Sequence, residues 1–233
     1  MRPRALVVVP AFNEAGNVER VLSEIRGLED APDVVVVDDG SLDGTASAAA
    51  EGGARVVRLP FNCGIGAAVQ TGLRLALEEG YEFAARLDGD GQHDPRALCG
   101  LLAPLEAGRA DFVIGSRYLE REGFQSSAPR RLGSHWFSAL LRLVCGQRIS
   151  DPTSGLWAAN RRATAVLAAE YASDYPEVDA VLHLVRQGCV ITEVPVTMRA
   201  RRAGRSTIDA PRAVYYMLKV TIALAAGRLR PQS

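Results

Sequence analysis

Long apolar runs are missing from this chain of 233 residues. No stretch approaches the ~20 consecutive apolar residues of a membrane-spanning helix, so we expect that the chain does not cross a membrane by itself. The N-terminal sequence MRPRALVVVPAFNE has basic residues, but its apolar run extends only from Ala5 to Ala11, with Asn13 and Glu14 behind it. Such a run is typical of a first β-strand and not of a signal peptide. We therefore expect a cytoplasmic protein.

Paired cysteines and an excess of basic residues are also missing. The four cysteines have no Cys-x-x-Cys spacing, which argues against a zinc ribbon and against a disulfide framework, so we expect reduced, buried and inert thiols. They are Cys63, Cys99, Cys145 and Cys189. Lys and Arg together number 27, and so do Asp and Glu. Because this balance leaves no global positive field, nucleic acid is not an expected partner.

The chain does contain short apolar runs that alternate with amphipathic stretches from residue 5 to about 115, a pattern typical of parallel α/β domains. It predicts strands over 5–9, 33–38, 54–59, 82–88 and 111–115, and helices near 16–27, 43–51, 65–79 and 95–107. Farther along, the sequence predicts helices over 129–146, 161–169 and 176–187, a strand over 189–199 and a basic loop over 199–207. Since 48% of the residues are apolar, the chain can bury one full core with a modest C-terminal extension.

Two acidic residues end the second predicted strand. The run VVDDGSLDGT brings Asp38 and Asp39 to the carboxyl edge of a parallel sheet, where open α/β folds bind ligands. Carboxylates there can accept hydrogen bonds from ribose hydroxyls or base nitrogens. An ordinary turn followed by a helix cap is the alternative interpretation of the same residues.

A glycine-rich run follows the third predicted strand. In NCGIGAAVQTG, Gly64 and Gly66 precede a helix whose N-terminus could meet a phosphate. The nicotinamide fingerprint, however, follows the first strand and needs a third small residue where Val69 stands. The sequence therefore disfavours a Rossmann oxidoreductase.

The run ARLDGDGQHDP gathers acidic and amide side chains after a strand that is predicted to be buried. On an extended segment, Asp88, Asp90 and Gln92 project the same way. Their oxygens suit Mg²⁺ or Mn²⁺, a cation that would also bind phosphate and balance the charge. A calcium loop is disfavoured because Cys99 stands where the EF-hand pattern requires Glu. A solvated acidic loop remains the alternative.

Together these motifs resemble those of one family. The runs VVVPAFNEAGNV, VVVVDDGSLDGT, NCGIGAAVQTG, LDGDGQHDP, VIGSRY and DPTSGLWAANR occur in the order and spacing of family 2 glycosyltransferases with the GT-A fold. Within that family the chain resembles the polyprenyl-phosphate sugar synthases of the dolichyl-phosphate mannose synthase type. The resemblance implies an α/β fold with a mainly parallel sheet and helices on both faces, a catalytic domain over residues 1–207, and a C-terminal amphipathic helix over 208–233.

The resemblance also implies residue roles. Donor-binding residues would be Pro10, Phe12, Glu14, Asp39, Asp88, Gly89, Arg202 and Ser206. The metal would be held by Asp88, Asp90 and Gln92, the acceptor phosphate by Arg117, Arg131 and Ser134, and the catalytic set would be Asp90, Arg117 and Arg131. Family members often have Tyr where Phe12 stands, and the register of the basic loop leaves Arg205 as a competitor for Arg202. For His93 we expect a structural place beside the metal, and for Asp151 a place bracing the DPTSG turn.

The implied reaction moves a hexose from a nucleotide sugar to a polyprenyl phosphate, with GDP-mannose as the first donor to consider. A divalent cation stabilises the departing nucleoside diphosphate, and an anionic acceptor phosphate needs no general base. A single displacement would invert the anomeric carbon. The alternatives are a family 2 enzyme with a soluble hydroxyl acceptor, which would need a base, and a non-catalytic nucleotide-sugar binding module.

The lipid acceptor implies contact with a membrane. The C-terminal run AVYYMLKVTIALAA is apolar, is interrupted by Lys219 and is bordered by arginines. It fits a helix at the membrane surface, a docking helix for a small membrane protein, or a helix packed on its own domain or on a second subunit. We expect peripheral attachment at the inner face of the membrane; the sequence leaves the oligomeric state open.

Overall fold

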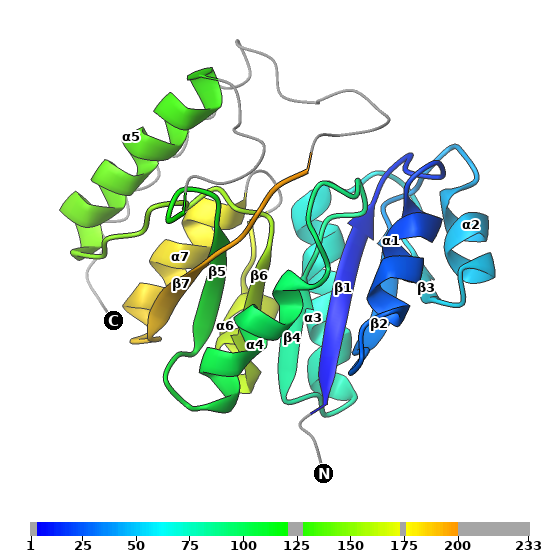
Figure 1. Ribbon diagram of the computed structural model, residues 1–233, viewed down its shortest axis with the longest axis horizontal. Coiled ribbons are helices and arrows are strands. Elements are labelled where there is room, and N and C mark those ends of the chain that lie inside the picture. The colour runs from blue at the N-terminus through cyan, green and yellow to red at the C-terminus, as the bar shows by residue number, and fades with distance from the viewer. Residues whose placement is uncertain (1–3, 121–127, 173–175, 200–233) are drawn as a thin grey trace.

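The computed structural model describes residues 4–120, 128–172 and 176–199, without the side chains of 128–132 (Figure 1). The strands are β1 (Ala5–Ala11), β2 (Asp33–Asp38), β3 (Arg55–Arg58), β4 (Phe83–Arg86), β5 (Phe112–Ser116), β6 (Trp157–Asn160) and β7 (Ile191–Pro195). The helices are α1 (Val18–Arg26), α2 (Thr45–Glu51), α3 (Ile65–Glu78), α4 (Ala97–Glu106), α5 (Ala128–Cys145), α6 (Arg161–Ala169) and α7 (Pro176–Arg186).

The described strands form one sheet in the order β3-β2-β1-β4-β6-β5-β7. Neighbouring strands pair in parallel, except that β6 runs antiparallel to both β4 and β5. The carboxyl ends of the parallel strands therefore share one edge, and α5 lies beside that edge (Figure 1). We call it the site edge, because the polar motifs of the sequence follow these strand ends.

Both faces of the sheet are covered, which explains why its strands are apolar at almost every position. Along β1, Leu6 and Val8 pack on the face covered by α3, α5, α6 and α7, whereas Val7 and Val9 pack on the face covered by α1, α2 and α4. Helix α1 shows the matching pattern, because its buried residues recur every three or four positions. They are Val18, Val21, Leu22 and Ile25.

These observations confirm the predicted α/β class, the mainly parallel sheet and the helices on both faces. The helices and strands predicted within the described residues are present, with ends that shift by a few residues. Strand β6 was not predicted. The expectation of unpaired cysteines is confirmed, but the expectation that all four are buried was wrong, because Cys99 is exposed and only Cys189 is buried. The predicted C-terminal helix over 208–233 lies outside the described residues.

Membrane crossing can be judged for the described helices. Their lengths and apolar contents leave none of them able to span a bilayer, a finding limited to the ranges given above.

Candidate active site

The loops after β1 and β2 are joined by hydrogen bonds at the site edge. The backbone N–H of Asn13 donates to Ser41 Oγ at 2.9 Å, and that of Glu14 donates to Thr45 Oγ1 at 2.8 Å. In return, Leu42 N–H donates to Asn13 Oδ1 at 3.0 Å. The two loops thus form one rigid rim.

The predicted donor residues of β1 lie on this rim. Pro10 is buried in the strand, and a Cβ placed on the predicted donor residue Gly89 would lie 3.4 Å from the Pro10 carbonyl oxygen, so these two residues are neighbours. Phe12 is 40% exposed at the end of the strand. The Glu14 carboxylate accepts a hydrogen bond from Asn17 Nδ2 at 2.7 Å.

Asp39 closes the N-terminus of α3. Its two carboxylate oxygens accept from Cys63 N–H at 2.7 Å and from Gly64 N–H at 3.0 Å, and the side chain is buried. These N–H groups are the ones that a phosphate would use in a dinucleotide fold. The structure thus gives a physical reason why the glycine-rich run is no phosphate loop, and it gives Asp39 a structural role beside its predicted role in the donor pocket.

Residues 88–92 form a turn, so the prediction of an extended segment was wrong. Gly91 has φ of +70°, and the Asp90 carboxylate accepts from Gln92 N–H at 3.0 Å, closing the turn. Asp90 and Gln92 are buried, whereas the side chain of Asp88 is 27% exposed. We call residues 88–92 the aspartate turn.

A buried arginine that the sequence analysis overlooked stands beside this turn. Arg86, on β4, is 2% exposed and donates from Nε to Asp88 Oδ1 at 3.0 Å and from Nη1 to Glu177 Oε1 at 2.8 Å. Burial lowers the pKa of this guanidinium, but the charges of Asp88 and Glu177 outweigh that effect and raise it, so Arg86 stays charged. The signal in the sequence was a lone charge inside an otherwise apolar strand.

His93 connects the aspartate turn to the segment that follows β7. It forms an antiparallel bridge with Met198, and its Nε2 lies 4.0 Å from Asp88 Oδ2. Burial lowers the pKa of His93 more strongly than Asp88 and Asp90 raise it, so the imidazole is neutral near pH 7. Its buried Nδ1 has no hydrogen-bond partner within the described ranges. This placement agrees with the structural position that we expected.

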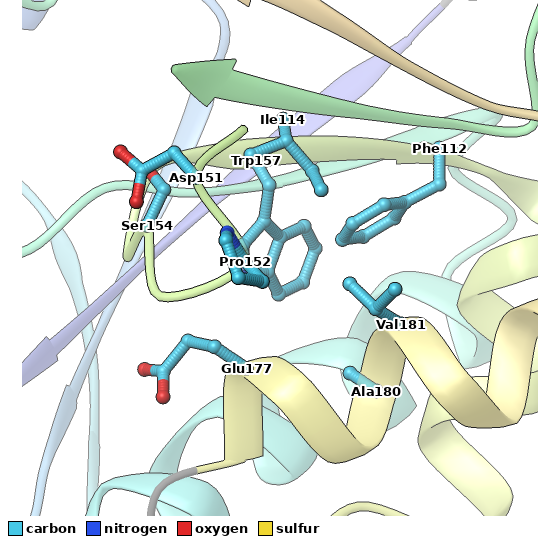
Figure 2. Close-up of a pocket in the computed structure, with 9 residues that line it drawn as sticks. All are labelled: Phe112, Ile114, Asp151, Pro152, Ser154, Trp157, Glu177, Ala180 and Val181. Carbon is cyan, nitrogen blue, oxygen red and sulfur yellow. The ribbon is translucent and has the colours of Figure 1, made fainter. Parts of the chain in front are cut away.

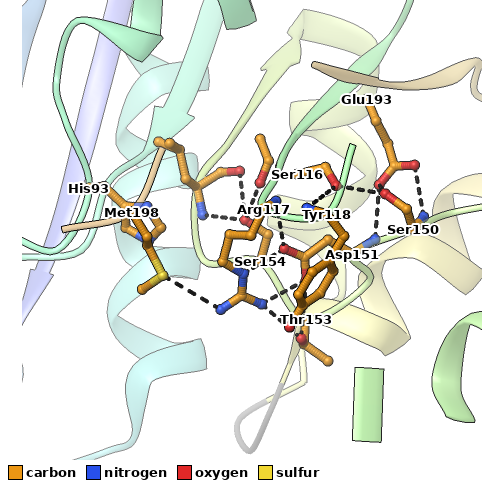
Figure 3. Close-up of polar contacts among 12 residues, drawn as sticks. His93, Ser116, Arg117, Tyr118, Ser150, Asp151, Thr153, Ser154, Glu193 and Met198 are labelled. Atoms are coloured by element: carbon orange, nitrogen blue, oxygen red, sulfur yellow. Dashed lines mark hydrogen bonds and ion pairs between the residues drawn. The ribbon is translucent and has the colours of Figure 1, made fainter. Parts of the chain in front are cut away.

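Arg117 stands on the other side of Met198 (Figure 3). Its Nε and Nη2 each lie 2.6 Å from an oxygen of Asp151, which is fully buried, and Nη2 also donates to Thr153 Oγ1 at 3.0 Å. Its Nη1 contacts Met198 Sδ at 3.9 Å. Burial lowers the pKa of Arg117, but the hydrogen bond and charge of Asp151 outweigh it and raise the pKa.

Glu193 of β7 holds the loop that carries Asp151 (Figure 3). Its carboxylate accepts from Ser150 N–H at 2.8 Å, from Ser150 Oγ at 2.9 Å and from Asp151 N–H at 3.0 Å. Ser116, at the end of β5, shares a hydrogen bond of 2.6 Å with Ser150 Oγ. Within its turn, Asp151 accepts from Thr153 Oγ1 at 3.3 Å, which agrees with the bracing place that we expected. Its main contacts, however, are with Arg117, and the supporting role of Glu193 was missed.

A small pocket has one carboxylate from each of the two arginine–carboxylate pairs in its lining (Figure 2). Asp151 and Glu177 line its polar side, and Phe112 and Trp157, whose ring centroids are 5.1 Å apart, line its apolar side. Each carboxylate at this pocket is bound to an arginine, Asp151 to Arg117 and Glu177 to Arg86. Both carboxylates are therefore engaged in ion pairs with an arginine.

The two remaining predicted acceptor residues, Arg131 and Ser134, lie on α5, and the predicted donor residues Arg202 and Ser206 come after β7. Ser134 is buried, and its Oγ has no hydrogen-bond partner among the described atoms, so it retains hydrogen-bonding capacity. His135 beside it lies against Tyr118, with ring centroids 6.1 Å apart, which places this part of α5 near Arg117. The side chain of Arg131 and the residues Arg202 and Ser206 lie outside the described set.

The aspartate turn fits a divalent cation in its donor chemistry. Arg86 donates a hydrogen bond to Asp88 Oδ1, which leaves Oδ2 as the oxygen of that carboxylate that could bind a cation. Gln92 Nε2 lies 3.5 Å from the Arg199 carbonyl, an orientation that leaves the amide oxygen as a donor for a cation. Within the described part of the chain, no three His, Cys, Asp or Glu side chains form a metal site on their own. In proteins Mg²⁺ is commonly bound by one or two carboxylates together with substrate phosphates.

Comparisons with known proteins agree with this site. Polyprenol monophosphomannose synthase of Mycolicibacterium smegmatis is 31% identical over 97% of this chain and 89% of its own length. Undecaprenyl-phosphate mannosyltransferase of Micrococcus luteus is 32% identical over 88% of each chain. The crystal structure of glucosyl-3-phosphoglycerate synthase from Mycobacterium tuberculosis, in complex with Mn²⁺, UDP-glucose and phosphoglyceric acid, matches with a TM-score of 0.75 at 25% identity, over 99% of this chain and 81% of that chain.

The described fold thus matches that of a solved nucleotide-sugar transferase, and residues 6–167 match the family described as Glycosyl transferase family 2. This match spans more than half of the chain and includes the loops after β1 and β2, the aspartate turn and Arg117. The chain therefore belongs to glycosyl transferase family 2, has the GT-A fold and is a glycosyltransferase.

Proposed function

We propose that this enzyme transfers a hexose from a nucleotide sugar to a polyprenyl phosphate, with inversion and with the help of Mg²⁺ or Mn²⁺. Mannose from GDP-mannose is the donor that we propose first. The two relatives described above, which are named for mannosyl transfer to lipid phosphates, support this choice of acceptor and sugar.

One observation carries the proposal: a fixed arginine lies next to the aspartate turn. Met198 contacts Arg117 through its sulfur at 3.9 Å and pairs through its backbone with His93, so it joins the two sites. Asp151 occupies the Nε and Nη2 edge of Arg117, whereas Nη1 meets only a thioether, a weak acceptor, among its described contacts. This nitrogen has donors to offer to an anionic acceptor.

An anionic acceptor also agrees with the lack of an available base among the described carboxylates at the pocket. A hydroxyl acceptor would need a carboxylate or histidine to take its proton. Asp151 is bound to Arg117 through both oxygens, and Glu177 is bound to Arg86. A phosphate that is already ionised needs only orientation, which Arg117 and the hydroxyl of Ser134 can provide.

On the donor side, the aspartate turn would hold the cation through Asp88, Asp90 and Gln92. A divalent cation bound there would supply positive charge opposite the departing diphosphate. The solved M. tuberculosis relative, which contains Mn²⁺ together with UDP-glucose, supports this assignment. The rim built from the loops after β1 and β2 would enclose the nucleotide, with Phe12 exposed toward it.

The test is transfer to lipid by the purified full chain. The enzyme is incubated with a panel of GDP and UDP sugars, Mg²⁺ or Mn²⁺, and either a polyprenyl phosphate or the matching polyprenol, and products are followed by mass spectrometry. We expect sugar linked to the phosphate lipid and not to the alcohol. Asp90→Asn should lower the rate by at least about 100-fold, because it removes charge opposite the leaving group. Asp30→Asn, at an exposed position before β2, is the matched control.

Each outcome decides one part of the proposal. Product from a donor other than GDP-mannose would replace the proposed sugar and keep the acceptor. Transfer to the alcohol, or donor hydrolysis without a lipid product, would overturn the phosphate acceptor. Full activity in excess chelator would overturn the role of the cation.

A further inference from the structure

We propose that Arg86 is a positioning residue that fixes the Asp88 carboxylate for binding of the cation and diphosphate, and that Glu177 holds Arg86 in place from the acceptor side. This inference rests on the proposed function of the aspartate turn. We call Asp88, Arg86 and Glu177 the buried bridge.

The geometry of the buried bridge is specific to arginine. Arg86 is 2% exposed, so its guanidinium is shielded from water, whereas its partners Asp88 and Glu177 are partly exposed. Nε points to Asp88 Oδ1 and Nη1 points to Glu177 Oε1, at 3.0 and 2.8 Å. Two different nitrogens of one planar group thus set the two carboxylates at a fixed separation, which the point charge of a lysine cannot do.

The packing around the bridge leaves Asp88 little freedom. Gly155, before β6, lies so close that a Cβ there would be 2.3 Å from Asp88 Oδ2 and 3.2 Å from Arg86 Nη2. Arg86 fixes Oδ1 from one side, and the backbone at Gly155 limits Oδ2 from the other. The second oxygen is therefore kept in one place, beside His93.

The charges of the bridge also favour cation binding. Asp88 and Glu177 each carry one negative charge and Arg86 carries one positive charge, so the bridge keeps a net charge of −1. Without Glu177, the guanidinium would cancel the charge of Asp88 and oppose a cation. Without Arg86, Asp88 and Glu177 would both lose the hydrogen-bond donor that orients them. All three residues are therefore needed to hold the Asp88 carboxylate in its orientation.

The bridge reaches across the site. Glu177 lies in the first turn of α7 and lines the small pocket together with Asp151, the partner of Arg117 (Figure 2). The position of the donor carboxylate thus depends on a helix that also borders the acceptor side. A change in Glu177 should therefore be detectable as a change in cation affinity.

The experiment measures Mn²⁺ binding to the full chain, with GDP or UDP present, by the loss of the free Mn²⁺ signal in electron paramagnetic resonance. Arg86→Lys keeps the positive charge but removes the planar guanidinium with its two separate donors. Glu177→Gln keeps the shape of the side chain but removes its negative charge. We expect each to weaken Mn²⁺ binding roughly 10-fold, as is typical for residues that orient metal ligands. The control is Arg162→Lys, whose arginine pairs with Asp111 at the opposite edge of the sheet. Thermal unfolding without metal checks that each variant is folded.

Unchanged Mn²⁺ affinity in both bridge variants, or an equal loss in the Arg162→Lys control, would overturn the inference. If Arg86→Lys does not fold, the result for Glu177→Gln decides. Mn²⁺ binding by the wild type that depends on the bridge, without sugar transfer to polyprenyl phosphate, would overturn the proposed acceptor and leave the inference standing. If the wild type binds no Mn²⁺ with either nucleotide, the cation part of the proposed function and this inference fall together.

Discussion

The absence of a side chain at residue 155 decides where the Asp88 carboxylate can lie. We predict that Gly155→Ala displaces this carboxylate, because the new Cβ would meet its Oδ2 at 2.3 Å. The expected result is a fall of about 10-fold or more in donor turnover, comparable to the loss of a residue that orients a metal ligand. Steady-state kinetics with the donor identified by the lipid-transfer experiment measure it.

The matched control is Gly100→Ala. Gly100 lies in α4, where a Cβ would meet nothing within 4 Å, so this change should leave turnover intact. Equal kinetics in the two alanine variants would mean that the Asp88 carboxylate can move without consequence.

At the scale of single residues, the sequence located the acidic run but did not predict its shape. The acidic run was recognisable because Asp88 and Asp90 follow a buried strand. Its shape was not, because the positive φ of Gly91 and the hydrogen bond from Gln92 N–H to Asp90 replace the extended backbone with a turn. Arg86 was missed because its partner Glu177 is 91 residues away, so only the fold brings the pair together.

Among the elements, β7 and the segment after it link the loop at 150–151 to the aspartate turn. We call this loop the acceptor loop, because it holds the proposed acceptor residue Arg117. We predict that Glu193→Gln loosens the loop at 150–151, because the amide would place an N–H group where a carboxylate oxygen now accepts from the backbone. Arg117 would then be less well fixed through Asp151. The expected result is a rise of roughly 10-fold in KM for polyprenyl phosphate, in line with the loss of a hydrogen bond to a charged group.

Separate titrations of donor and acceptor measure this effect. Glu106→Gln, at an exposed position at the end of α4, provides the comparison. A parallel rise in the donor KM would contradict a role that is confined to the acceptor loop.

The segment after β7 also forms ion pairs with the opposite face of the site. Arg199 lies 2.6 Å from Glu24 of α1 and 2.9 Å from Asp94 before α4. The hydrogen bond from Arg96 lowers the pKa of Asp94 most, and Arg199 adds to it, so the pKa is well below its usual range. A carboxylate with a lowered folded pKa stabilises the protein above its unfolded pKa of about 4 and loses that effect as the pH falls toward the folded value.

We therefore predict that Asp94→Asn lowers the free energy of unfolding by about 1 kcal/mol at pH 7, a modest value because partly exposed ion pairs are screened. This difference from the wild type should shrink as the pH falls below 4. Urea unfolding at several pH values measures it, with Glu106→Gln as the baseline. A difference that stays constant down to the most acidic condition would contradict the ion-pair origin.

The sequence predicted most elements because their periodicities are local. Strand β6 escaped because WAAN is only four residues long, lacks alternation and follows a turn-rich segment. Its pairing with β4 and β5 depends on contacts such as Ala85 with Ala158, which no local pattern reveals. The supporting role of Glu193 was missed for the same reason, since its partners come from a loop more than 40 residues earlier.

For the molecule as a whole, the open question is how it reaches a lipid acceptor. We propose peripheral attachment, at the inner face of the membrane, in part through α5. Trp136 and Leu143 are seven residues apart and so share one face of this helix, and they are 49% and 68% exposed. This exposed pair lies on the same helix as Ser134, which we propose contacts the acceptor phosphate.

We predict that replacing both Trp136 and Leu143 by Ala reduces co-sedimentation with anionic lipid vesicles several-fold at low salt, because each large apolar side chain contributes about 1 kcal/mol or more on burial. Val190→Ala is the control, since Val190 is 55% exposed at the opposite edge of the sheet. A wild-type protein that remains in the supernatant with vesicles present would contradict peripheral attachment. Equal binding by the double variant and the wild type would exclude α5 as the contact.

The reversed direction of β6 has a consequence for how such enzymes diversify. Since β5 ends at the site edge and β6 starts there, the chain between them, residues 117–156, leaves the sheet and returns to it on the same side. That excursion includes Arg117, α5 and Asp151, whereas the loops after β1 and β2 and the aspartate turn come earlier in the chain. A segment of this kind can be lengthened, shortened or exchanged without rethreading a strand. With the roles proposed above, a change between Arg117 and Asp151 would alter the acceptor side and leave the earlier donor loops in place, as long as Gly155 keeps the space for the Asp88 carboxylate.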